Sequence, residues 1–318
     1  MKILVTGGAG FIGSNLCERL LKEKHEVICL DNFNDYYSPI VKKNNIASFL
    51  NNPDFELATE DILNKAGLEK IFTQHKIDTV IHLAAKAGVR ASLIDPEGFS
   101  VNNIIGTFNV LEACQKHGIK NLIFGSSSSV YGNNTKVPFA ETDNVDYPIS
   151  PYAATKKACE LFCFNYHHLY HLNVICLRFF TVYGPNNRPD MAHFKMLDSI
   201  INGQPITKYG DGESRRDYTF VDDIVDGIIA CLNKNLGFEI INLGGSQTIT
   251  LNRMIEVLEK TTGKKAIIEN LPFPPGDVNQ TYADISKAKS LLGWEPKTLY
   301  QEGVKKLFDW YQKKLTHI

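Results

Sequence analysis

Two side chains that can move a proton together, Tyr152 and Lys156, stand four residues apart in the sequence. Pro151 suits the first turn of a helix and Ser150 can cap it, so we expect a helix to begin here. On a helix, the i, i+4 spacing places both side chains on one face. A free phenol has a pKa near ~10, and a neighbouring ammonium lowers that pKa by favouring the phenolate. Because this spacing also occurs by chance on helices, the pair indicates a general base only when other groups support it.

A run of hydroxyl side chains provides that support. Ser126, Ser127, Ser128 and Ser129 follow an apolar segment, residues 121–125, that indicates a buried strand. Hydroxyls at the end of a strand can hydrogen-bond a substrate alcohol beside the phenolate, although any single serine could equally belong to a polar loop. Together, the serines, the tyrosine and the lysine predict an enzyme that oxidises a secondary alcohol.

Three glycines near the N-terminus indicate where a dinucleotide binds. Gly7, Gly10 and Gly13 lie between the first expected strand and the first expected helix, in a G-x-x-G-x-x-G spacing. Glycine permits a tight turn and a close approach of the backbone to a pyrophosphate, whose charge the helix N-terminus favours. Asp31 ends the second expected strand, where a carboxylate accepts hydrogen bonds from ribose hydroxyls and repels a 2′-phosphate. The sequence therefore predicts NAD rather than NADP, and the positive nicotinamide would further favour the Tyr152 phenolate.

Further cofactor contacts are expected around these residues. Small side chains at the end of the strand over residues 79–83 leave room for the cofactor backbone, and a carboxylate after the third strand region could meet the adenine. The additional residues expected at the cofactor are Phe11, Ile12, Asn32, Asn34, Asp61, Ile62, Leu83, Ala84, Ala85 and Lys86.

Short apolar runs that alternate with segments of helical period predict an α/β fold, a Rossmann-type doubly wound parallel sheet with helices on both faces. We expect strands at residues 3–6, 26–30, 79–83, 121–125, 173–178 and 239–243, and helices at 13–24, 65–75, 99–117, 151–169, 192–201, 251–261, 285–292 and 301–313. We expect residues 1–180, with 218–246 returning to them, to form the NAD-binding domain. Residues 181–217 and 247–318 are expected to form a smaller, discontinuous C-terminal substrate-binding domain.

The composition argues against several other classes of function. The 318 residues carry a net charge of -1, with acids and bases interspersed, so nothing predicts a nucleic-acid or membrane partner. The seven cysteines lie mostly inside apolar runs without a C-x-x-C pair, which is typical of free thiols in a reducing cytosol, and no metal site is expected. No charged leader precedes the first strand and no apolar stretch could span a bilayer, so we expect a cytoplasmic protein.

The glycine spacing, Asp31, the serine run and Tyr152-x-x-x-Lys156 together resemble the extended short-chain dehydrogenase/reductase family. The resemblance covers nearly the whole chain, through residues 216–223 and 276–278, and is greatest to the UDP-glucuronate 4-epimerases. The most telling stretches are Asp31-Asn32-Phe33-Asn34-Asp35-Tyr36-Tyr37, Ala87-Gly88-Val89-Arg90, Arg178-Phe179-Phe180-Thr181-Val182-Tyr183-Gly184-Pro185 and Arg188-Pro189-Asp190-Met191-Ala192.

This resemblance implies a role for each matching residue. Tyr152 would be the catalytic acid and base, Lys156 its electrostatic and ribose-binding partner, and Ser127 the hydroxyl that orients the sugar O4. Asn103 matches a family asparagine near the site and, with Tyr152 and Lys156, joins the expected cofactor contacts. The UDP-sugar would be held by Ser128, Ser129 and Thr181 at the sugar carboxylate, by Arg216 at the diphosphate, by Arg188 at the nucleotide end, by Asp277 at the uridine ribose, and by Arg90.

The implied reaction is the NAD-dependent epimerisation of a UDP-sugar at C4, from UDP-glucuronate to UDP-galacturonate, through a transient 4-keto sugar. For a uronic acid that intermediate is a β-keto acid, so the enzyme must hold the carboxylate against loss of carbon dioxide. Related dehydratases place Asp and Glu where Ser128 and Ser129 stand, and related decarboxylases place Glu where Ser129 stands, so both are disfavoured. Epimerases of UDP-glucose or its N-acetylated analogue, which usually have Asn where Thr181 lies, remain the alternative, and a non-catalytic NAD-binding regulator is a distant one.

Two features leave the substrate range and the assembly open. Lys86 stands where glutamine is usual, and Pro274-Pro275 where an arginine is often found. The resemblance also implies a homodimer through a four-helix bundle built from the helices around residues 99–117 and 151–169. Its face could include Phe108, Leu111, Leu161 and Phe162, although burial against the domain's own sheet would explain these side chains equally well.

Overall fold

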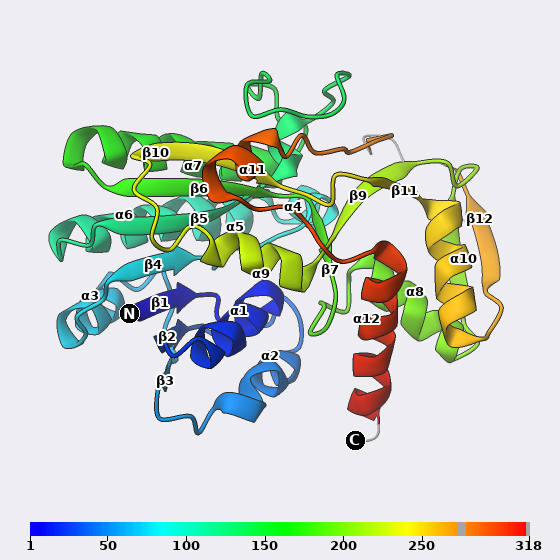
Figure 1. The fold of residues 1–318 in the computed structure, drawn as a ribbon, viewed down its shortest axis with the longest axis horizontal. Coiled ribbons are helices and arrows are strands. Elements are labelled where there is room, and N and C mark those ends of the chain that lie inside the picture. The colour runs from blue at the N-terminus through cyan, green and yellow to red at the C-terminus, as the bar shows by residue number, and fades with distance from the viewer. Residues whose placement is uncertain (273–277, 316–318) are drawn as a thin grey trace.

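The computed structural model describes residues 1–272 and 278–315, and its main feature is a parallel sheet with helices on both faces (Figure 1). The strand order is β10-β6-β5-β4-β1-β2-β3, and every pairing in this sheet is parallel. The strands are β1 (Lys2–Thr6), β2 (Glu26–Leu30), β3 (Phe55–Ala58), β4 (Thr79–His82), β5 (Asn121–Ser127), β6 (Asn173–Phe179) and β10 (Phe238–Leu243). The predicted α/β doubly wound sheet is confirmed, and each expected strand is present to within a residue or two.

Successive side chains of each central strand enter two different cores. Ile3 and Val5 of β1 pack with α1 (Phe11–Lys22) and α9 (Val221–Ile229), whereas Leu4 packs on the opposite face. That face is covered by α3 (Lys65–Gln74), α6 (Gly106–Lys116) and α7 (Pro151–Tyr170). A strand that is buried on both faces needs a continuous apolar run, which is why residues 3–5 of β1 and 27–30 of β2 are all apolar.

The helix expected over residues 99–117 is a composite. It comprises α5 (Pro96–Ser100), a π-helical turn (Val101–Ile105) and α6. Asp95 begins it, since its Oδ1 accepts a hydrogen bond from the Gly98 amide at 2.9 Å, and Pro96 occupies the first turn. The wider π turn carries Asn103, and such turns are frequent at functional sites.

The remaining elements lie mostly beside the carboxyl edge of the sheet, at the right of Figure 1. A three-stranded sheet comprises β7 (Thr181–Tyr183), β9 (Arg215–Phe220) and β11 (Thr248–Thr250), and a two-stranded sheet pairs β8 (Pro205–Tyr209) with β12 (Ile267–Leu271). The other helices are α2 (Pro39–Ile46), α4 (Val89–Ile94), α8 (Ala192–Ile201), α10 (Leu251–Thr262), α11 (Ser286–Leu292) and α12 (Tyr300–Leu315), with short 3-10 turns at Ala47–Phe49 and Ser128–Tyr131. The domain boundaries expected from the sequence stay a prediction.

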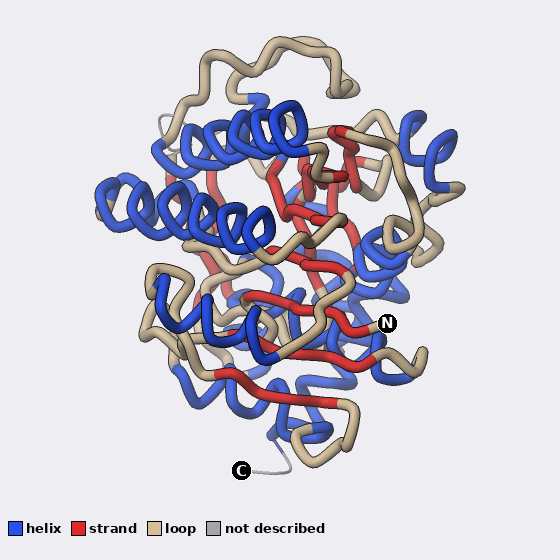
Figure 2. The backbone as a smooth tube through the Cα atoms, turned by 90° about the vertical axis from the view of Figure 1, so that its left-hand side faces the viewer, coloured by secondary structure: helices blue, strands red, loops and turns tan. Residues whose placement is uncertain are grey.

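Two surface features are visible from a second direction. In Figure 2, the long helices α6 and α7 lie side by side along one flank, and the loop between the 3-10 turn at Ser128–Tyr131 and α7 stands out at the top. None of the helices in the described ranges is both long and apolar enough to cross a membrane.

Candidate active site

A cavity of about 460 Å³ lies at the carboxyl ends of β1, β2, β4 and β5. The strand order reverses between β1 and β4, and in doubly wound sheets ligands bind at such a switch point. The lining includes most residues expected from the sequence: Gly7, Gly10, Phe11, Ile12, Gly13, Asp31, Asn32, Asn34, Ile62, Leu83, Ala84, Ala85, Lys86, Ser127, Ser128, Ser129, Tyr152, Lys156, Thr181, Arg188 and Arg216.

Three expected site residues among those described are not part of this lining, and a fourth residue is not described. Asp61 lines an adjoining smaller cavity and accepts a hydrogen bond from Asn32 Nδ2 at 2.8 Å. Arg90 on α4 places its guanidinium 5.0 Å from the centroid of the Tyr209 ring, outside the lining of the main cavity. Asn103 lies behind the lining and hydrogen-bonds the backbone of Lys86, which is part of it. Asp277 lies outside the described residues.

The glycine-rich turn could not be built from other residues. Gly7 has a φ of +70°, and a Cβ on it would lie 2.7 Å from the Ala84 amide nitrogen. A Cβ on Gly13 would lie 2.2 Å from the Gly7 carbonyl oxygen. No side chain caps α1, whose first residue follows Gly10, so its free N–H groups face a ligand site. This cradle fits a dinucleotide pyrophosphate.

Asp31 is held at the end of β2 by the backbone. Its Oδ2 accepts a hydrogen bond from the Ala9 amide at 3.2 Å and its Oδ1 accepts one from the Phe33 amide at 2.9 Å. Burial raises the pKa of the Asp31 carboxyl, and the two amides and the Lys42 ammonium oppose that shift. The side chain therefore has a set orientation toward the cavity, as ribose recognition requires.

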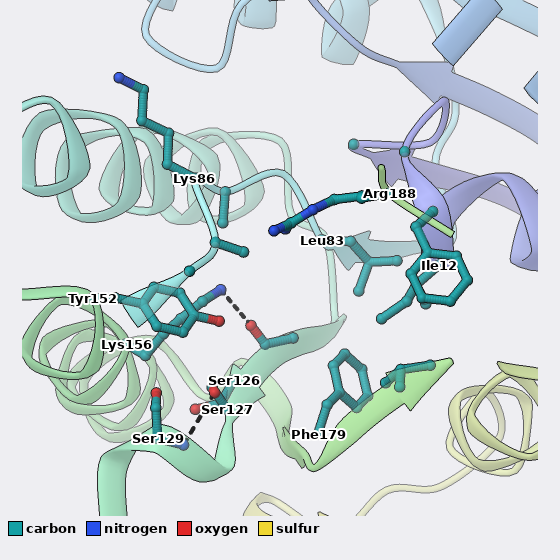
Figure 3. Close-up of a pocket in the computed structure, with 18 of the residues that line it drawn as sticks. Ile12, Leu83, Lys86, Ser126, Ser127, Ser129, Tyr152, Lys156, Phe179 and Arg188 are labelled. Atoms are coloured by element: carbon teal, nitrogen blue, oxygen red, sulfur yellow. Dashed lines mark hydrogen bonds between the residues drawn. The ribbon is translucent and has the colours of Figure 1, made fainter. Parts of the chain in front are cut away.

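Tyr152 and Lys156 lie on one face of α7, which Ser150 caps by accepting a hydrogen bond from the Ala153 amide at 3.2 Å. The hydroxyls of Tyr152 and Ser127 point into the same part of the cavity (Figure 3). Lys156 Nζ donates to the Gly125 carbonyl oxygen at 2.6 Å, which ties α7 to β5 beneath the phenol. The structure thus brings the three predicted catalytic residues together.

The expected effect of Lys156 on Tyr152 needs a correction. Desolvation in the cavity raises the pKa of the Tyr152 phenol, while Ser127 and the charge of Arg188 act in the opposite direction. Burial also lowers the pKa of the Lys156 ammonium. The expected fall in the phenol pKa therefore does not occur in the protein alone, because burial outweighs the attraction of the Arg188 charge, and the part of the expectation that depends on the positive nicotinamide stays a prediction.

Neutral hydroxyls surround the remaining space at this end. Ser128, Ser129 and Thr181 all line the cavity. The two positions directly after Ser127 thus carry hydroxyls and not carboxylates. The Ser129 Oγ is buried and has no hydrogen-bond partner among the described residues, whereas its amide donates to Ser127 Oγ at 3.1 Å. A buried hydroxyl is normally paired, so a polar ligand atom fits here.

Arg188 enters the cavity from the segment after β7. Its Nε and Nη2 donate to the two carboxylate oxygens of Asp190 at 2.9 and 2.6 Å, and its guanidinium lies 5.5 Å from the centroid of the Tyr36 ring. It is near enough to Tyr152 to lower the pKa of that phenol. Its role at the nucleotide end stays a prediction.

Asn103 positions the cofactor edge of the cavity rather than lining it. The Lys86 amide donates to Asn103 Oδ1 at 2.8 Å, and Asn103 Nδ2 donates to the Lys86 carbonyl oxygen and to Thr155 Oγ1, both at 3.0 Å. The Lys86 ammonium meanwhile pairs with Asp95 Oδ2 at 2.8 Å. The π turn thus joins the end of β4 to the first turn of α7.

Some residues of the lining were not expected from the sequence. Tyr36, Tyr37 and Lys42 lie in the segment after β2, whereas Phe179 ends β6 and Phe180 follows it. The two tyrosines belong to a stretch that carried the family resemblance but suggested no role. Lys42 falls in the short helix α2, which has no clear apolar period to reveal it.

Comparisons with known proteins agree with this site. The model of the family described as "NAD dependent epimerase/dehydratase family" matches residues 3–244. A UDP-glucuronate 4-epimerase of Thermodesulfobacterium geofontis is 48% identical over 98% of this chain and 96% of its own length. The crystal structure of UDP-glucuronic acid 4-epimerase from Bacillus cereus with UDP-glucuronic acid and NAD has a TM-score of 0.92 at 41% identity, and covers 99% of this chain and 100% of that chain. A UDP-glucose 4-epimerase of Thermotoga maritima has a TM-score of 0.90 at 34% identity, with the same coverage.

Asp217, next to Arg216 on β9, gives a pH-dependent prediction. It is fully buried, and its carboxylate accepts hydrogen bonds from the Gly245 amide at 2.5 Å and the Ala283 amide at 3.0 Å. Burial raises its pKa from 3.8 to about 7. Between these values the unfolded chain has lost the proton and the folded chain has kept it, so stability falls as pH rises.

We therefore expect the wild-type chain to lose about 3 kcal/mol relative to Asp217→Asn between pH 4 and pH 7, with a smaller further loss up to about pH 8, where the folded carboxyl is almost fully ionised. Urea unfolding of both proteins across this range measures the difference. A difference that stays constant with pH, or that changes in the opposite direction, would contradict the assignment.

Proposed function

The chain belongs to the NAD-dependent epimerase/dehydratase family, and we propose that within it the protein interconverts UDP-glucuronate and UDP-galacturonate. As an NAD-dependent UDP-sugar 4-epimerase it is an isomerase whose cofactor is NAD. The choice of a uronic acid is supported above all by the neutral hydroxyls of Ser128, Ser129 and Thr181 in the cavity. The Ser129 hydroxyl in particular is buried and without a partner among the described residues.

The protein's own groups handle the proton in this mechanism. NAD, when bound, supplies the acceptor and donor of the C4 hydride and a positive charge near the phenol. Tyr152 Oη removes the proton from the sugar O4 as the alcohol becomes a ketone, and returns it when the ketone is reduced on its other face. Ser127 Oγ orients O4 beside the phenol. Lys156, held by the Gly125 carbonyl oxygen, provides a fixed positive charge next to this pair.

The carboxylate must be restrained while the sugar is in its 4-keto form. If the C5–C6 bond aligns with the ketone π system, it breaks, carbon dioxide leaves, and the resulting enolate takes a proton to give a 4-keto pentose. Hydroxyl groups can hydrogen-bond the carboxylate and so hold it away from this alignment. Unlike Asp or Glu, they add neither an acid nor a base to the site. Ser128, Ser129 and Thr181 are suited to that task because none of them is ionised.

A UDP-glucose 4-epimerase is the second candidate, because a relative of that activity shares the fold at 34% identity. Such a substrate offers a 6-hydroxyl in place of the carboxylate and needs fewer donors. Incubation with each UDP-sugar in turn, followed by separation of the products, distinguishes the two.

We also propose a homodimer, which places apolar side chains of neighbouring helices in an interface. Leu161 on α7 and Ile94 on α4 are 57% and 87% exposed, and Ile105 in the π turn is 48% exposed. Of the four side chains that the sequence suggested for the interface, only Leu161 is exposed. Leu111 is fully buried in the chain's own core, and the partly buried Phe108 and Phe162 pack against that core.

Leu161→Asp should therefore convert a dimer into a monomer, whereas Leu271→Asp, an exposed position on β12, should not. Sedimentation velocity measures this, and a monomeric wild-type protein would contradict the proposal.

Removal of the Tyr152 hydroxyl tests the assignment of the acid and base. We expect Tyr152→Phe to reduce kcat by about 10²- to 10⁴-fold, because the variant lacks the hydroxyl beside Ser127 that would exchange the proton, while NADH binding stays largely intact. Product formation from UDP-glucuronate and NADH fluorescence measure the two quantities. Turnover at the wild-type rate would disprove the role of Tyr152.

Thr181→Ala tests the carboxylate site. Loss of one hydrogen bond to an anion should raise KM for UDP-glucuronate about tenfold or more and increase the fraction of UDP-pentose product. Thr79→Ala, which removes a buried hydroxyl in β4, serves as the matched control and should leave the products unchanged. Unchanged affinity for the acid and no rise in the decarboxylated product would count against a uronic acid substrate.

A further inference from the structure

The hydroxyl of Tyr37 is an unpaired polar group in the main cavity. It is buried and has no hydrogen-bond partner among the described residues, although the Tyr37 side chain lines the cavity. Buried hydroxyls are nearly always paired with protein or water, because an unpaired one loses its hydration without compensation. A group that is orphaned in this way beside a ligand cavity points to a ligand atom as its partner.

The position of this hydroxyl indicates which part of a ligand it meets. A Cβ built on Gly10 would lie 3.9 Å from Tyr37 Oη, and Gly10 immediately precedes α1 in the glycine-rich turn. The Asp31 carboxylate is also near this hydroxyl. Burial raises the pKa of the Tyr37 phenol most, and the negative charge of Asp31 raises it further. The phenol therefore stays protonated and lies between the phosphate-binding turn and the ribose-binding carboxylate.

The ring of Tyr37 is held in this position by a buried cation. Lys42 Nζ lies 4.8 Å from the centroid of the ring. The same ammonium donates to the Asn34 carbonyl oxygen at 2.9 Å and to Asn34 Oδ1 at 2.8 Å. Lys42 is only 5% exposed, so it is part of the wall of the site rather than a surface charge.

We propose that Tyr37 Oη donates a hydrogen bond to a phosphate oxygen in the adenosine half of NAD, with Lys42 holding the ring in place. A phenol is well suited to this, since it offers a donor to an anion at the N-terminus of α1, where negative charge is already favoured. The contact helps to retain the cofactor between turnovers. It rests on NAD as the cofactor and is independent of which UDP-sugar is the substrate.

The test uses the full chain, freed of dinucleotide by charcoal treatment, and measures Kd for NADH by fluorescence and Kd for ADP by calorimetry. Tyr37→Phe should weaken both ligands about fivefold to tenfold. The thermal midpoint of the ligand-free Tyr37→Phe protein should be equal to or higher than that of the wild type, because the variant lacks the unpaired hydroxyl. Tyr166→Phe is the matched control, since that hydroxyl donates to Glu112 away from the cavity, and it should leave both Kd values unchanged.

Lys42 gives an independent arm of the same experiment. Lys42→Met should also weaken NADH and ADP, whereas Lys42→Arg, which keeps a cation beside the ring, should restore most of the affinity. The proposal is overturned if Tyr37→Phe binds NADH within twofold of the wild type. It is also overturned if Tyr37→Phe weakens NADH but not ADP, because the contact would then lie in the nicotinamide half.

Discussion

The positions of Tyr152 and Lys156 depend on how α7 is attached to the sheet, and a buried ion pair provides the attachment. Arg178 of β6 donates from Nε and Nη2 to the two oxygens of Glu160 on α7 at 2.9 and 2.8 Å, and both side chains are 1% exposed. Ser126 Oγ of β5 donates to the same carboxylate at 2.6 Å. A buried charge is tolerated only with its partner, so α7 has a single favourable register on the sheet. Glu160 follows Lys156 by one turn and Tyr152 by two, and this register therefore places both of them.

A second set of contacts attaches the cofactor side of the cavity to the same helix. Asn103 binds both backbone groups of Lys86, in the segment after β4, and also the hydroxyl of Thr155 on α7. This segment and α7 thus share hydrogen bonds to one side chain. Such a frame lets a few hydroxyls in the cavity remain unpaired, because the surrounding structure cannot collapse onto them.

The sequence predicted the parts of this arrangement that depend on local pattern. The central strands are continuous apolar runs, the glycines have their spacing, and the helix with Tyr152 begins at a Ser-Pro cap, so each is visible in a short window. The strands β7, β8, β9, β11 and β12 were missed because none of them is a continuous apolar run: each contains polar residues, as in Arg215–Phe220 of β9. Asn103 was expected to contact the cofactor. It lies in the π turn and binds the backbone of Lys86, and a π turn was not predicted from the sequence. Likewise, the apolar pattern of α6 could not tell whether Leu111 faces the chain's own core or a partner.

The behaviour of the Tyr152 phenol follows from the balance between burial and charge. Within the protein, desolvation raises its pKa, and the lysine beside it has its own pKa lowered by the same burial. The Lys156 ammonium also donates a hydrogen bond to the Gly125 carbonyl oxygen. This hydrogen bond fixes the position of the lysine side chain and does not involve the Tyr152 phenol. Burial and charge thus act in opposite directions on the phenol, and an oxidised nicotinamide beside it would add a further positive charge that lowers its pKa. In the proposed reaction, the phenolate would therefore be favoured most in the state that also contains the hydride acceptor.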